Sequence, residues 1–318
     1  MSWETIIPFI KPLEPFILDP EVSDILVNGP NQVFIEKNGQ LQLVNVSLTE
    51  RMLDQAVVHI ARSVGDDINV DKPLLDARLP DGSRVAAVIR PCSLNGTTMA
   101  IRKFQSKVYT AEALVRTGAV TPEVMGLLQS AVEQQQNILV AGRTGAGKTT
   151  FLNALARSIP DNQRIFVIED TAEIQIDRSH IVRLVSRPPQ PNVSEVSIRE
   201  LLRRTLRLRP DRIILGEIRG GEAFDLVQAM NTGHSGTLST IHANSCSEAL
   251  SRLAICVLQS GINLPYNSIN RTIGEALNIV VHLARTDKGK RFVDEVVRIR
   301  TYDQATDWFD FETCYSAR

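Results

Sequence analysis

The feature that most constrains this chain is a glycine-rich segment near its middle, Gly142-Arg-Thr-Gly-Ala-Gly-Lys-Thr149. The apolar residues 137–141 precede it, and residues 149–157, which have helical periodicity, follow it. The pattern GxxxxGK(S/T) between a strand and a helix is typical of a phosphate-binding loop, in which backbone N–H groups surround a β-phosphate. An incidental glycine turn would leave the lysine unexplained, so the segment predicts a nucleotide site.

The chemistry of such a loop suggests roles for its side chains. We expect Lys148 to reach the β- and γ-phosphate oxygens and the hydroxyl of Thr149 to bind Mg²⁺. The residues predicted to bind the nucleotide are Gly142, Arg143, Thr144, Gly145, Ala146, Gly147, Lys148, Thr149 and Thr150.

The chain around this loop predicts an α/β domain with a mainly parallel sheet, because apolar stretches alternate with helical patterns such as residues 197–207. A helix is expected at 248–258. Strands at 278–283 and 291–301, joined by an Asp-Lys-Gly-Lys turn, predict an antiparallel hairpin at the edge of the sheet. The other strands are expected at residues 137–141, 164–168, 181–185, 212–215 and 236–241.

The first hundred residues predict a smaller α+β domain. Asn38-Gly39 has the chemistry of a hairpin turn, and Ser47-Leu-Thr-Glu50 resembles a capping box for a helix at 51–64. A length of 318 residues favours two domains. We place them at 1–104 and 113–318, with a linker at 105–112. Strands of the first domain are expected at residues 24–27, 32–36, 40–44, 74–79, 84–89 and 97–104.

The beginning of the chain has one apolar helical face interrupted by prolines, which disfavour a long helix. We expect this segment to pack on its own domain, and contact with a membrane or a partner is the alternative. The apolar residues are Trp3, Ile6, Ile7 and Ile10, and the prolines are Pro8, Pro12 and Pro15.

Composition excludes several classes of protein. With 43% apolar and 22% charged residues, the chain matches a globular protein and not a disordered or collagen-like one. Its 35 Lys and Arg nearly balance 36 Asp and Glu, so no overall field favours nucleic acid, and direct nucleic-acid binding is not expected. Four scattered cysteines disfavour a zinc ribbon or disulfide framework. No apolar run is long enough for a membrane span, and a cytoplasmic location fits best.

Acidic residues follow two of the predicted strands. The first ends at Glu217, where many NTPases have aspartate, and the longer reach of glutamate suits a general base that acts on water. The second is followed by Glu169, Asp170 and Glu173, whose mutual repulsion a bound Mg²⁺ would relieve. Solvated surface carboxylates are the alternative for both groups.

Two histidines, His234 and His242, lie at opposite ends of a strand of small residues, which would let the backbone approach a ligand closely. His242 is at the carboxyl end, where an imidazole could sense a γ-phosphate. By itself, each histidine would more often be a hydrogen-bonded structural residue, and no role is predicted for His234.

Arginines are concentrated between Arg199 and Arg219, where seven stand against three acids. Their spacing allows a basic helix face that could follow a nucleic acid, meet a neighbouring subunit or be solvated. The first domain raises the same question at Arg78, Arg84, Arg90 and Arg102.

Four segments in this order resemble the type II and type IV secretion (traffic) ATPases. GRTGAGKT is similar to their Walker A motif, IEDTAEI to the Asp box, LRPDRIILGEIRGGEA to an atypical Walker B motif and TGHSGTLSTIHANS to the His box. VSDILVNGPNQVFIEKNGQL and LPDGSRV resemble the branch with the conjugal-transfer (TrbB-like) ATPases. The tetracysteine insertion and extra domains of type II and tight-adherence pilus ATPases are not found in this sequence, so conjugal-transfer ATPases are the nearest match.

The resemblance implies a RecA-like ATPase domain, ATP and Mg²⁺ as cofactors and a homo-hexamer with nucleotide between the two domains of each subunit. It assigns Glu217 as the catalytic glutamate, Glu173 as an acid near Mg²⁺, and His242 as the His-box residue. It also implies that Arg84 and Arg102 contact the phosphates. Arg78 and Arg90 receive no firm role.

The implied function is an Mg²⁺-dependent ATPase that powers conjugative type IV secretion, either pilus assembly or substrate transfer, through closure of the two domains. It would act at the cytoplasmic face of the inner membrane, with inner-membrane components of the apparatus as partners. The alternatives are a RecA-like nucleic-acid motor, a type II or tight-adherence pilus ATPase, and a nucleotide-gated scaffold with negligible turnover.

Overall fold

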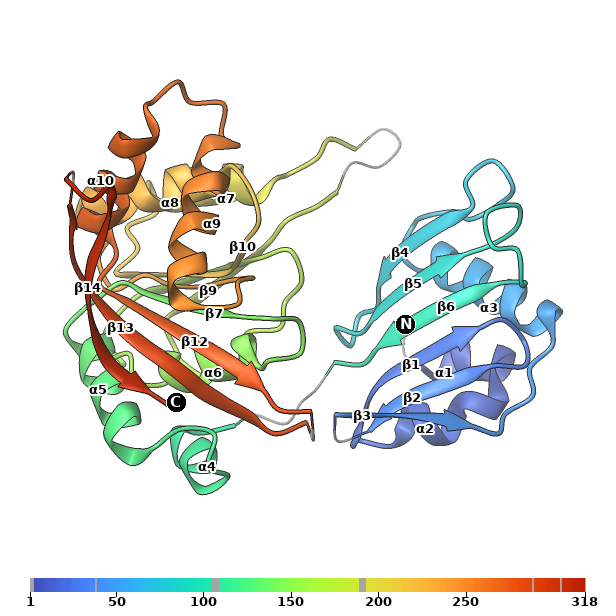
Figure 1. Cartoon of the computed structure of the whole chain (residues 1–318). Helices are drawn as coiled ribbons and strands as arrows, with labels where there is room; N and C mark the ends of the chain where they lie inside the picture. The colour runs from blue at the N-terminus through green and yellow to red at the C-terminus, as the bar shows by residue number, and fades with distance from the viewer. Residues whose placement is uncertain are drawn as a thin grey trace. The chain divides into compact units, whose positions relative to one another are not determined.

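The chain, described by a computed structural model, divides into two compact units, residues 1–107 and 108–318, each built around its own β-sheet (Figure 1). Three predictions fall partly outside the described residues: Asn38 of the first expected turn, Lys288 of the last, and residues 105–108 of the expected linker. Within the described part, no helix has the length and apolar character needed to span a membrane. The described residues are 3–37, 39–104, 109–188, 193–287, 289–303 and 305–317.

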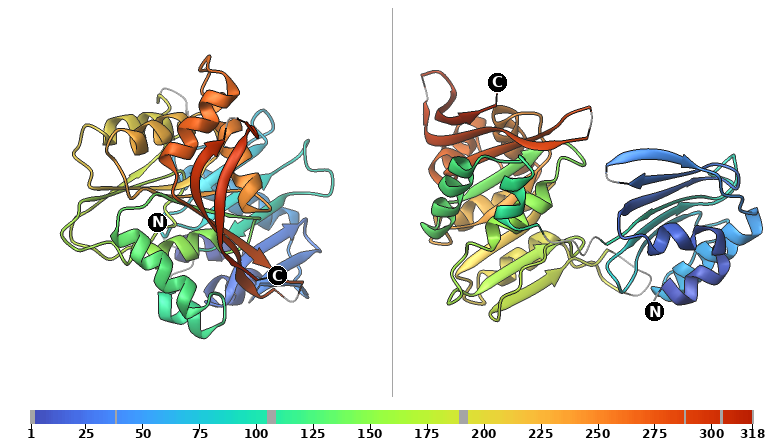
Figure 2. Two further views of the ribbon diagram at one scale, coloured as in Figure 1. Left: turned by 60° about the vertical axis from the view of Figure 1, so that its left-hand side comes forward. Right: turned by 90° about the horizontal axis from the view of Figure 1, so that it is seen from below.

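Unit 1 is a six-stranded sheet in the order β3-β2-β1-β6-β5-β4. Every neighbouring pair is antiparallel. The helices lie on one face of this sheet (Figure 2). The elements are β1 (Val22–Asn28), β2 (Val33–Lys37), β3 (Gln40–Val44), β4 (Leu74–Arg78), β5 (Arg84–Val88), β6 (Thr98–Arg102), α1 (Trp3–Ile6), α2 (Glu14–Leu18), α3 (Glu50–Ser63) and the 3₁₀ helices η1 (Ile7–Phe9) and η2 (Lys11–Leu13).

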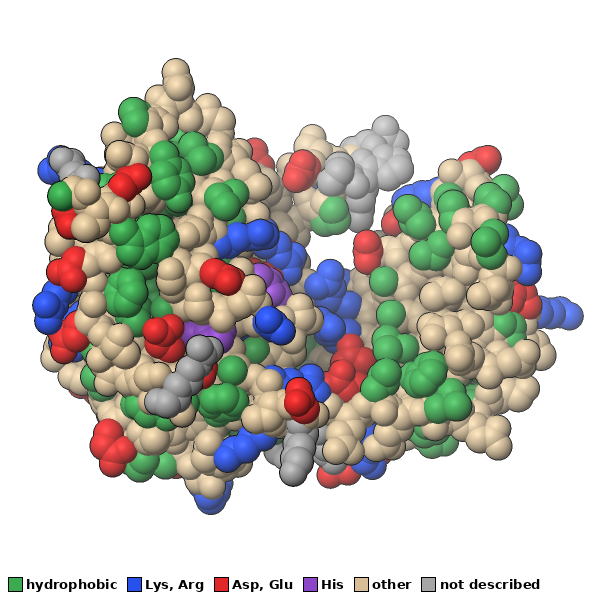
Figure 3. Space-filling view, in the orientation of Figure 1, with side chains coloured by type: hydrophobic (Ala, Val, Ile, Leu, Met, Phe, Trp, Pro, Cys, Tyr) green, Lys and Arg blue, Asp and Glu red, His purple; other side chains and the backbone are tan. Residues whose placement is uncertain are grey.

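Burial alternates along β4, β5 and β6 of unit 1, because helices cover only one face of its sheet. On β6, Met99 and Ile101 are buried, whereas Arg102 is exposed. On the other face, hydrophobic side chains gather over β1 to β3 (Figure 3), where Leu26 and Phe34 are cross-strand neighbours. Side chains of that face are therefore not required for the core of the unit.

The N-terminal segment packs on its own unit, as predicted. Ile6, Ile7 and Ile10 are buried in the core of unit 1. Each of η1, η2 and α2 has a proline in its first turn, which explains why the segment forms short helices and not one long one.

The predicted capping box of α3 is wrong in detail. The helix begins at Glu50, and the side chain of Thr49, not Ser47, accepts the N–H of Met52. The carboxylate of Glu50 accepts the N–H of Thr97 at 2.7 Å. It therefore connects the helix to the segment before β6, a distant part of the chain that local pattern does not reveal.

Unit 2 is an eight-stranded sheet in the order β14-β13-β12-β7-β11-β10-β8-β9. The six strands from β12 to β9 are parallel, and β13 and β14 extend the sheet in antiparallel fashion. This mainly parallel arrangement agrees with the sequence prediction, although β14 was not predicted. The strands are β7 (Ile138–Gly142), β8 (Ile165–Glu169), β9 (Ile181–Val185), β10 (Arg212–Ile218), β11 (Leu238–Ile241), β12 (Ile279–Arg285), β13 (Arg291–Asp303) and β14 (Trp308–Ser316).

Both faces of this sheet are covered. Leu139 and Ala141 of β7 pack in the core with α7 to α10, whereas Ile138 and Val140 pack in the core with α4 to α6. Every residue of β7 and β8 is consequently buried. The helices are α4 (Ala111–Arg116), α5 (Pro122–Glu133), α6 (Lys148–Ala156), α7 (Ile198–Thr205), α8 (Glu222–Asn231), α9 (Cys246–Leu258) and α10 (Tyr266–Ala276).

Candidate nucleotide-binding site

Four strand ends meet at one edge of the sheet in unit 2. β7 leads into the glycine-rich loop, β8 ends at Glu169, β10 carries Glu217, and His242 directly follows β11. These strands are parallel and lie in the order β7-β11-β10-β8. Their carboxyl ends therefore bring together side chains that are up to a hundred residues apart, at the edge where α/β proteins bind ligands.

The glycine-rich loop turns sharply between β7 and α6. Gly145 and Gly147 have φ angles of 75° and 91°, a left-handed conformation that favours glycine. The N–H of Ala146 donates to the carbonyl of Arg143 at 3.2 Å and closes the turn. The first N–H groups of α6 lack partners within the helix, which makes its start suited to a phosphate.

Lys148 is folded onto this loop. Its Nζ donates to the carbonyl oxygens of Gly142 at 3.0 Å and Arg143 at 3.3 Å, and the residue is 8% exposed. Burial lowers the pKa of Lys148, while the charge of Glu217 acts in the opposite direction. The ammonium thus lies at the mouth of the loop, where phosphate oxygens would be stronger partners than the two carbonyls.

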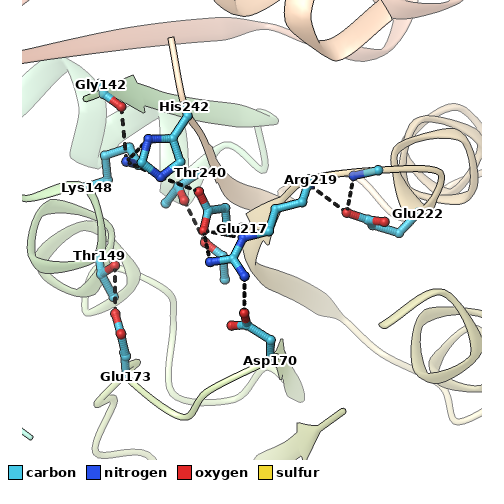
Figure 4. A network of polar contacts seen from close by, with 12 residues as sticks. Gly142, Lys148, Thr149, Asp170, Glu173, Glu217, Arg219, Glu222, Thr240 and His242 are labelled. Atoms are coloured by element: carbon cyan, nitrogen blue, oxygen red, sulfur yellow. Dashed lines mark hydrogen bonds and ion pairs between the residues drawn. The ribbon is translucent and has the colours of Figure 1, made fainter. Parts of the chain in front are cut away.

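Glu217 lies between an arginine and a histidine (Figure 4). Its Oε2 accepts a hydrogen bond from Nε of Arg219 at 2.8 Å and another from Nη2 of the same residue. His242 Nε2 lies 2.7 Å from Oε1, an ion-pair distance. That contact lacks hydrogen-bond geometry, so Oε1 is buried without a hydrogen-bond partner among the described residues. One carboxylate oxygen is held by Arg219, and the other is buried beside the ring of His242.

His242 lies between Glu217 and the loop. Nζ of Lys148 is 3.3 Å from both ring nitrogens of His242. Burial and the charge of Lys148 lower the pKa of His242, against the influence of Glu217. The ring of His242 thus faces the ammonium of Lys148 on one side and the carboxylate of Glu217 on the other.

The small polar residues of β11 connect neighbouring strands, which differs from the expectation that they leave room for a ligand. The hydroxyl of Ser239 donates to the carbonyl of Leu215 at 2.8 Å, and that of Thr240 to Gly216 at 2.7 Å. Both are buried and fix β11 against β10, which places His242 beside Glu217. His234 precedes β11 at the opposite edge of the sheet and is not part of the site.

The three predicted acids at and beyond the end of β8 have separate partners. Burial raises the pKa of Glu169 to about 7, although two backbone N–H groups oppose this shift. Its Oε1 accepts those N–H groups, from Glu173 at 2.8 Å and Ile174 at 2.9 Å. Asp170 forms an ion pair with Arg219. Oε2 of Glu173 accepts the hydroxyl of Thr149 at 3.3 Å.

The oxygen atoms of Thr149 and Glu173 form a set that suits Mg²⁺. In the described part of the chain, no group of three His, Cys, Asp or Glu side chains could hold a metal ion by itself. Mg²⁺ in nucleotide sites commonly binds one or two protein oxygens, with phosphate and water oxygens completing the shell. A hydroxyl and a carboxylate 3.3 Å apart at the start of α6 match that requirement.

The other predicted loop residues differ in their surroundings. Nε of Arg143 donates to Oδ1 of Asn244 at 2.7 Å, so this side chain bonds the segment after β11. Thr144 is exposed at the turn, and Thr150 is half-buried in the first turn of α6. Arg143 thus has a partner within unit 2 before any nucleotide is considered.

The arginines of unit 1 form a row on the uncovered face of its sheet. Arg78 pairs in register with Arg84, and Arg84 pairs with Arg102. Arg102 pairs with Asp24, to whose Oδ1 its Nε donates at 3.0 Å. Arg90 follows β5 and lies outside this row. The two arginines that were assigned to phosphate binding are therefore direct cross-strand neighbours.

The arginine-rich segment after Arg199 is not one continuous basic face. Arg199 and Arg203 both form ion pairs with Asp225 of α8. Arg212 is 1% exposed and donates to three oxygens of its own unit, and burial lowers its pKa to about 10. Arg219 belongs to the site. Arg212 is therefore not part of any exposed basic face, whereas Arg199, Arg203 and Arg219 have acids of their own unit as partners. The three alternatives for the segment, a nucleic-acid track, a contact with a neighbouring subunit and a solvated face, stay predictions.

Sequence reasoning missed the role of Arg219 and of Asp170. Arg219 is two residues after Glu217 at the end of a strand, where residues i and i+2 share one side. That spacing indicates that the side chains of Glu217 and Arg219 lie on the same side. The partnership with Asp170 could not be foreseen, because it depends on β8 lying next to β10.

This fold and this loop define a P-loop nucleotide-binding protein. A family model described as "Type II/IV secretion system protein" matches residues 10–315. The chain belongs to this family, which confirms the resemblance to the secretion ATPases.

Relatives agree with this assignment. The chain is 36% identical over 302 residues to the type IV secretion system protein PtlH of Bordetella pertussis, and the match covers 87% of this chain and 89% of that protein. It is 31% identical over 300 residues to a putative conjugal transfer protein of Mycobacterium tuberculosis, covering 91% and 84%. The crystal structure of the VirB11 ATPase of Brucella suis is 33% identical, with a TM-score of 0.50 and coverage of 92% and 94%.

Proposed function

We propose that this protein is an Mg²⁺-dependent ATPase of a type IV secretion apparatus. One observation carries the proposal. Beside a phosphate-binding loop, Glu217 has one oxygen held by Arg219, and the other, Oε1, makes no hydrogen bond among the described residues and lies 2.7 Å from Nε2 of His242. A carboxylate held in this way is oriented to accept a proton from water, which is the role of a general base in phosphoryl transfer to water.

The residues of unit 2 divide the remaining work. The loop N–H groups and Lys148 bind the β- and γ-phosphates. On binding, Lys148 replaces its hydrogen bonds to the carbonyls of Gly142 and Arg143 with bonds to phosphate oxygens. Thr149 and Glu173 hold Mg²⁺, which offsets phosphate charge when bound. The imidazole of His242, which lies beside Lys148, donates a hydrogen bond toward the γ-phosphate.

Further parts of the proposal rest on the family. We propose a RecA-like ATPase domain, a homo-hexamer and nucleotide-driven domain closure, with Arg84 and Arg102 as phosphate ligands. Their adjacency in one cross-strand row supports a joint role. We also propose conjugative secretion at the cytoplasmic face of the inner membrane, supported by the likeness to a putative conjugal transfer protein.

The test is ATP turnover per subunit, measured against protein concentration, with and without single-stranded DNA. Lys148→Ala is the blank. We expect turnover that requires Mg²⁺, rises with protein concentration as subunits assemble, and is indifferent to DNA. Turnover equal to that of the blank would overturn the proposal, and strong DNA stimulation with steep salt dependence would favour a nucleic-acid motor instead.

A further inference from the structure

Arg219 connects the acidic ends of two parallel strands. Its guanidinium donates to Oε2 of Glu217 through Nε and Nη2, and its Nη1 forms an ion pair with Asp170. Glu217 lies on β10 and Asp170 directly follows β8, and these strands are adjacent. One planar side chain thus bridges both carboxylates, a geometry that arginine permits and lysine does not.

The backbone of Arg219 is held as firmly as its side chain. The carboxylate of Glu222 accepts the N–H of Arg219 at 2.7 Å and the N–H of Gly220 at 2.9 Å (Figure 4). A Cβ at Gly221 would lie 2.7 Å from Cα of Ser260, so the loop also packs closely against the segment after α9. The guanidinium therefore extends from a fixed point.

The arginine lies on the solvent side of the glutamate. The side chain of Arg219 is 58% exposed, whereas that of Glu217 is 14% exposed. Because Arg219 binds only Oε2, the other oxygen of Glu217 is directed toward His242 and, through it, toward Lys148 and the glycine-rich loop. Rotation of the carboxylate away from the loop would break both hydrogen bonds to Arg219.

We propose that Arg219 is a positioning residue for Glu217, and that Asp170 acts through Arg219. The guanidinium fixes the rotamer in which Oε1 faces the phosphate side of the site, and Asp170 fixes the guanidinium. The inference rests on the proposed general-base role of Glu217. It adds a role for two residues, Arg219 and Asp170, that bind neither nucleotide nor metal in this scheme.

The experiment compares steady-state ATP turnover of the full chain with Arg219→Ala, Arg219→Lys and a matched control, Arg203→Ala. Arg203 is 55% exposed and pairs with an acid of the same unit, Asp225, on another helix. We expect Arg219→Ala to lower kcat by about 100-fold with KM within about 3-fold of wild type, since proton transfer typically contributes 10²–10⁴-fold. The kcat of Arg219→Lys should lie between those of wild type and Arg219→Ala, and the kcat of Arg203→Ala should match wild type.

Two further measurements separate positioning from a general structural effect. Added guanidinium at low millimolar concentration should restore part of the kcat of Arg219→Ala, and should not affect Glu217→Gln. Asp170→Asn should lower kcat less than Arg219→Ala, and the double variant should be no slower than Arg219→Ala alone, because both changes act on one interaction.

Opposite outcomes overturn the inference. If Arg219→Ala raises KM and leaves kcat intact, Arg219 binds nucleotide instead. If guanidinium gives no rescue or the double variant is additive, the bridge does not position Glu217. These failures are distinct from failure of the proposed function, in which wild type would not exceed the Lys148→Ala blank.

Discussion

In unit 1, helices cover one face of the sheet, whereas in unit 2 they cover both faces. This difference decides where each unit can place functional groups. In unit 1, every second residue of a strand lies on a face that its helices leave uncovered, and there Arg78, Arg84 and Arg102 form a row. In unit 2, the strands β7 and β8 are buried throughout, and the ionisable groups of the candidate site stand at strand ends. A sheet covered on one face can carry functional side chains on its open face, whereas a sheet covered on both faces can carry them only at the ends of its strands.

The strand-end acids of unit 2 provide the largest expected effect. Glu217→Gln should lower ATP turnover by about 10³-fold, because the amide cannot take a proton from water. ATP binding should persist, since the loop and Lys148 are intact. Turnover and binding of a fluorescent ATP analogue on the same preparation check this. Hydrolysis at the wild-type rate would rule out Glu217 as the base.

Core substitutions test whether burial alternates in unit 1 and not in unit 2. Ile101→Ala, on the covered face of β6, should cost about 2–5 kcal/mol of unfolding free energy, while its neighbour Ala100→Ser should cost less than about 0.5. In β7, Leu139→Ala and Val140→Ala should both be costly, since the two residues face different cores. Denaturant titration measures all four. Equal costs at Ile101 and Ala100 would contradict the one-sided packing.

Glu169, which is buried at the end of β8, should make the stability of the protein depend on pH. Its folded pKa of about 7 is above the ordinary value of 4.5, so the folded state binds the proton more tightly than the unfolded state. This contribution to stability is complete below about pH 4.5 and is lost as the pH rises to about 7, on the order of 3 kcal/mol in total.

Glu169→Gln is the matched variant, because it keeps the shape and one acceptor oxygen but cannot titrate. Its unfolding free energy should therefore depend less on pH between 4.5 and 7 than that of the wild type. Parallel slopes for the two proteins across this range would show that the carboxyl does not titrate in the folded state as described.

The arginine row of unit 1 gives the smallest of these effects. Arg84→Ala and Arg102→Ala should each lower turnover by about 30- to 100-fold through loss of phosphate stabilisation. Thermal stability should change little, since both residues lie on the face that needs no core packing. Arg90→Ala, outside the row, is the control. Loss of stability in step with activity would make the row structural instead.

Much of the fold could be predicted because it depends on neighbouring residues. The expected strand 181–185 coincides with β9, and the strand-loop-helix around the P-loop was evident from apolar runs and glycines. Strand β14 has the alternation of a strand, Trp308-Phe-Asp-Phe, and could have been found. The cap of α3 was misassigned because Glu50 bonds a residue 47 positions away.

The candidate site was predicted in its parts and not in its connections. The loop, Glu217 and His242 were evident as motifs, and the sheet does bring them to one edge. The bridge from Arg219 to Asp170 spans 49 residues, and no local pattern indicates it. For the same reason, no local pattern indicates that Arg199 and Arg203 share Asp225, that Arg212 is buried and that Arg219 joins the site.

By itself, the sequence determined the family, the phosphate-binding loop and most of the strands, because these depend on spacing between near neighbours in the chain. The tertiary structure decided which partner each charged group has. Arg203 and Arg219 are similar residues in one segment, yet one meets a helix acid and the other the proposed base. A charge interacts with whatever lies within a few ångströms, and strand order in the sheet, not position in the sequence, sets that neighbourhood.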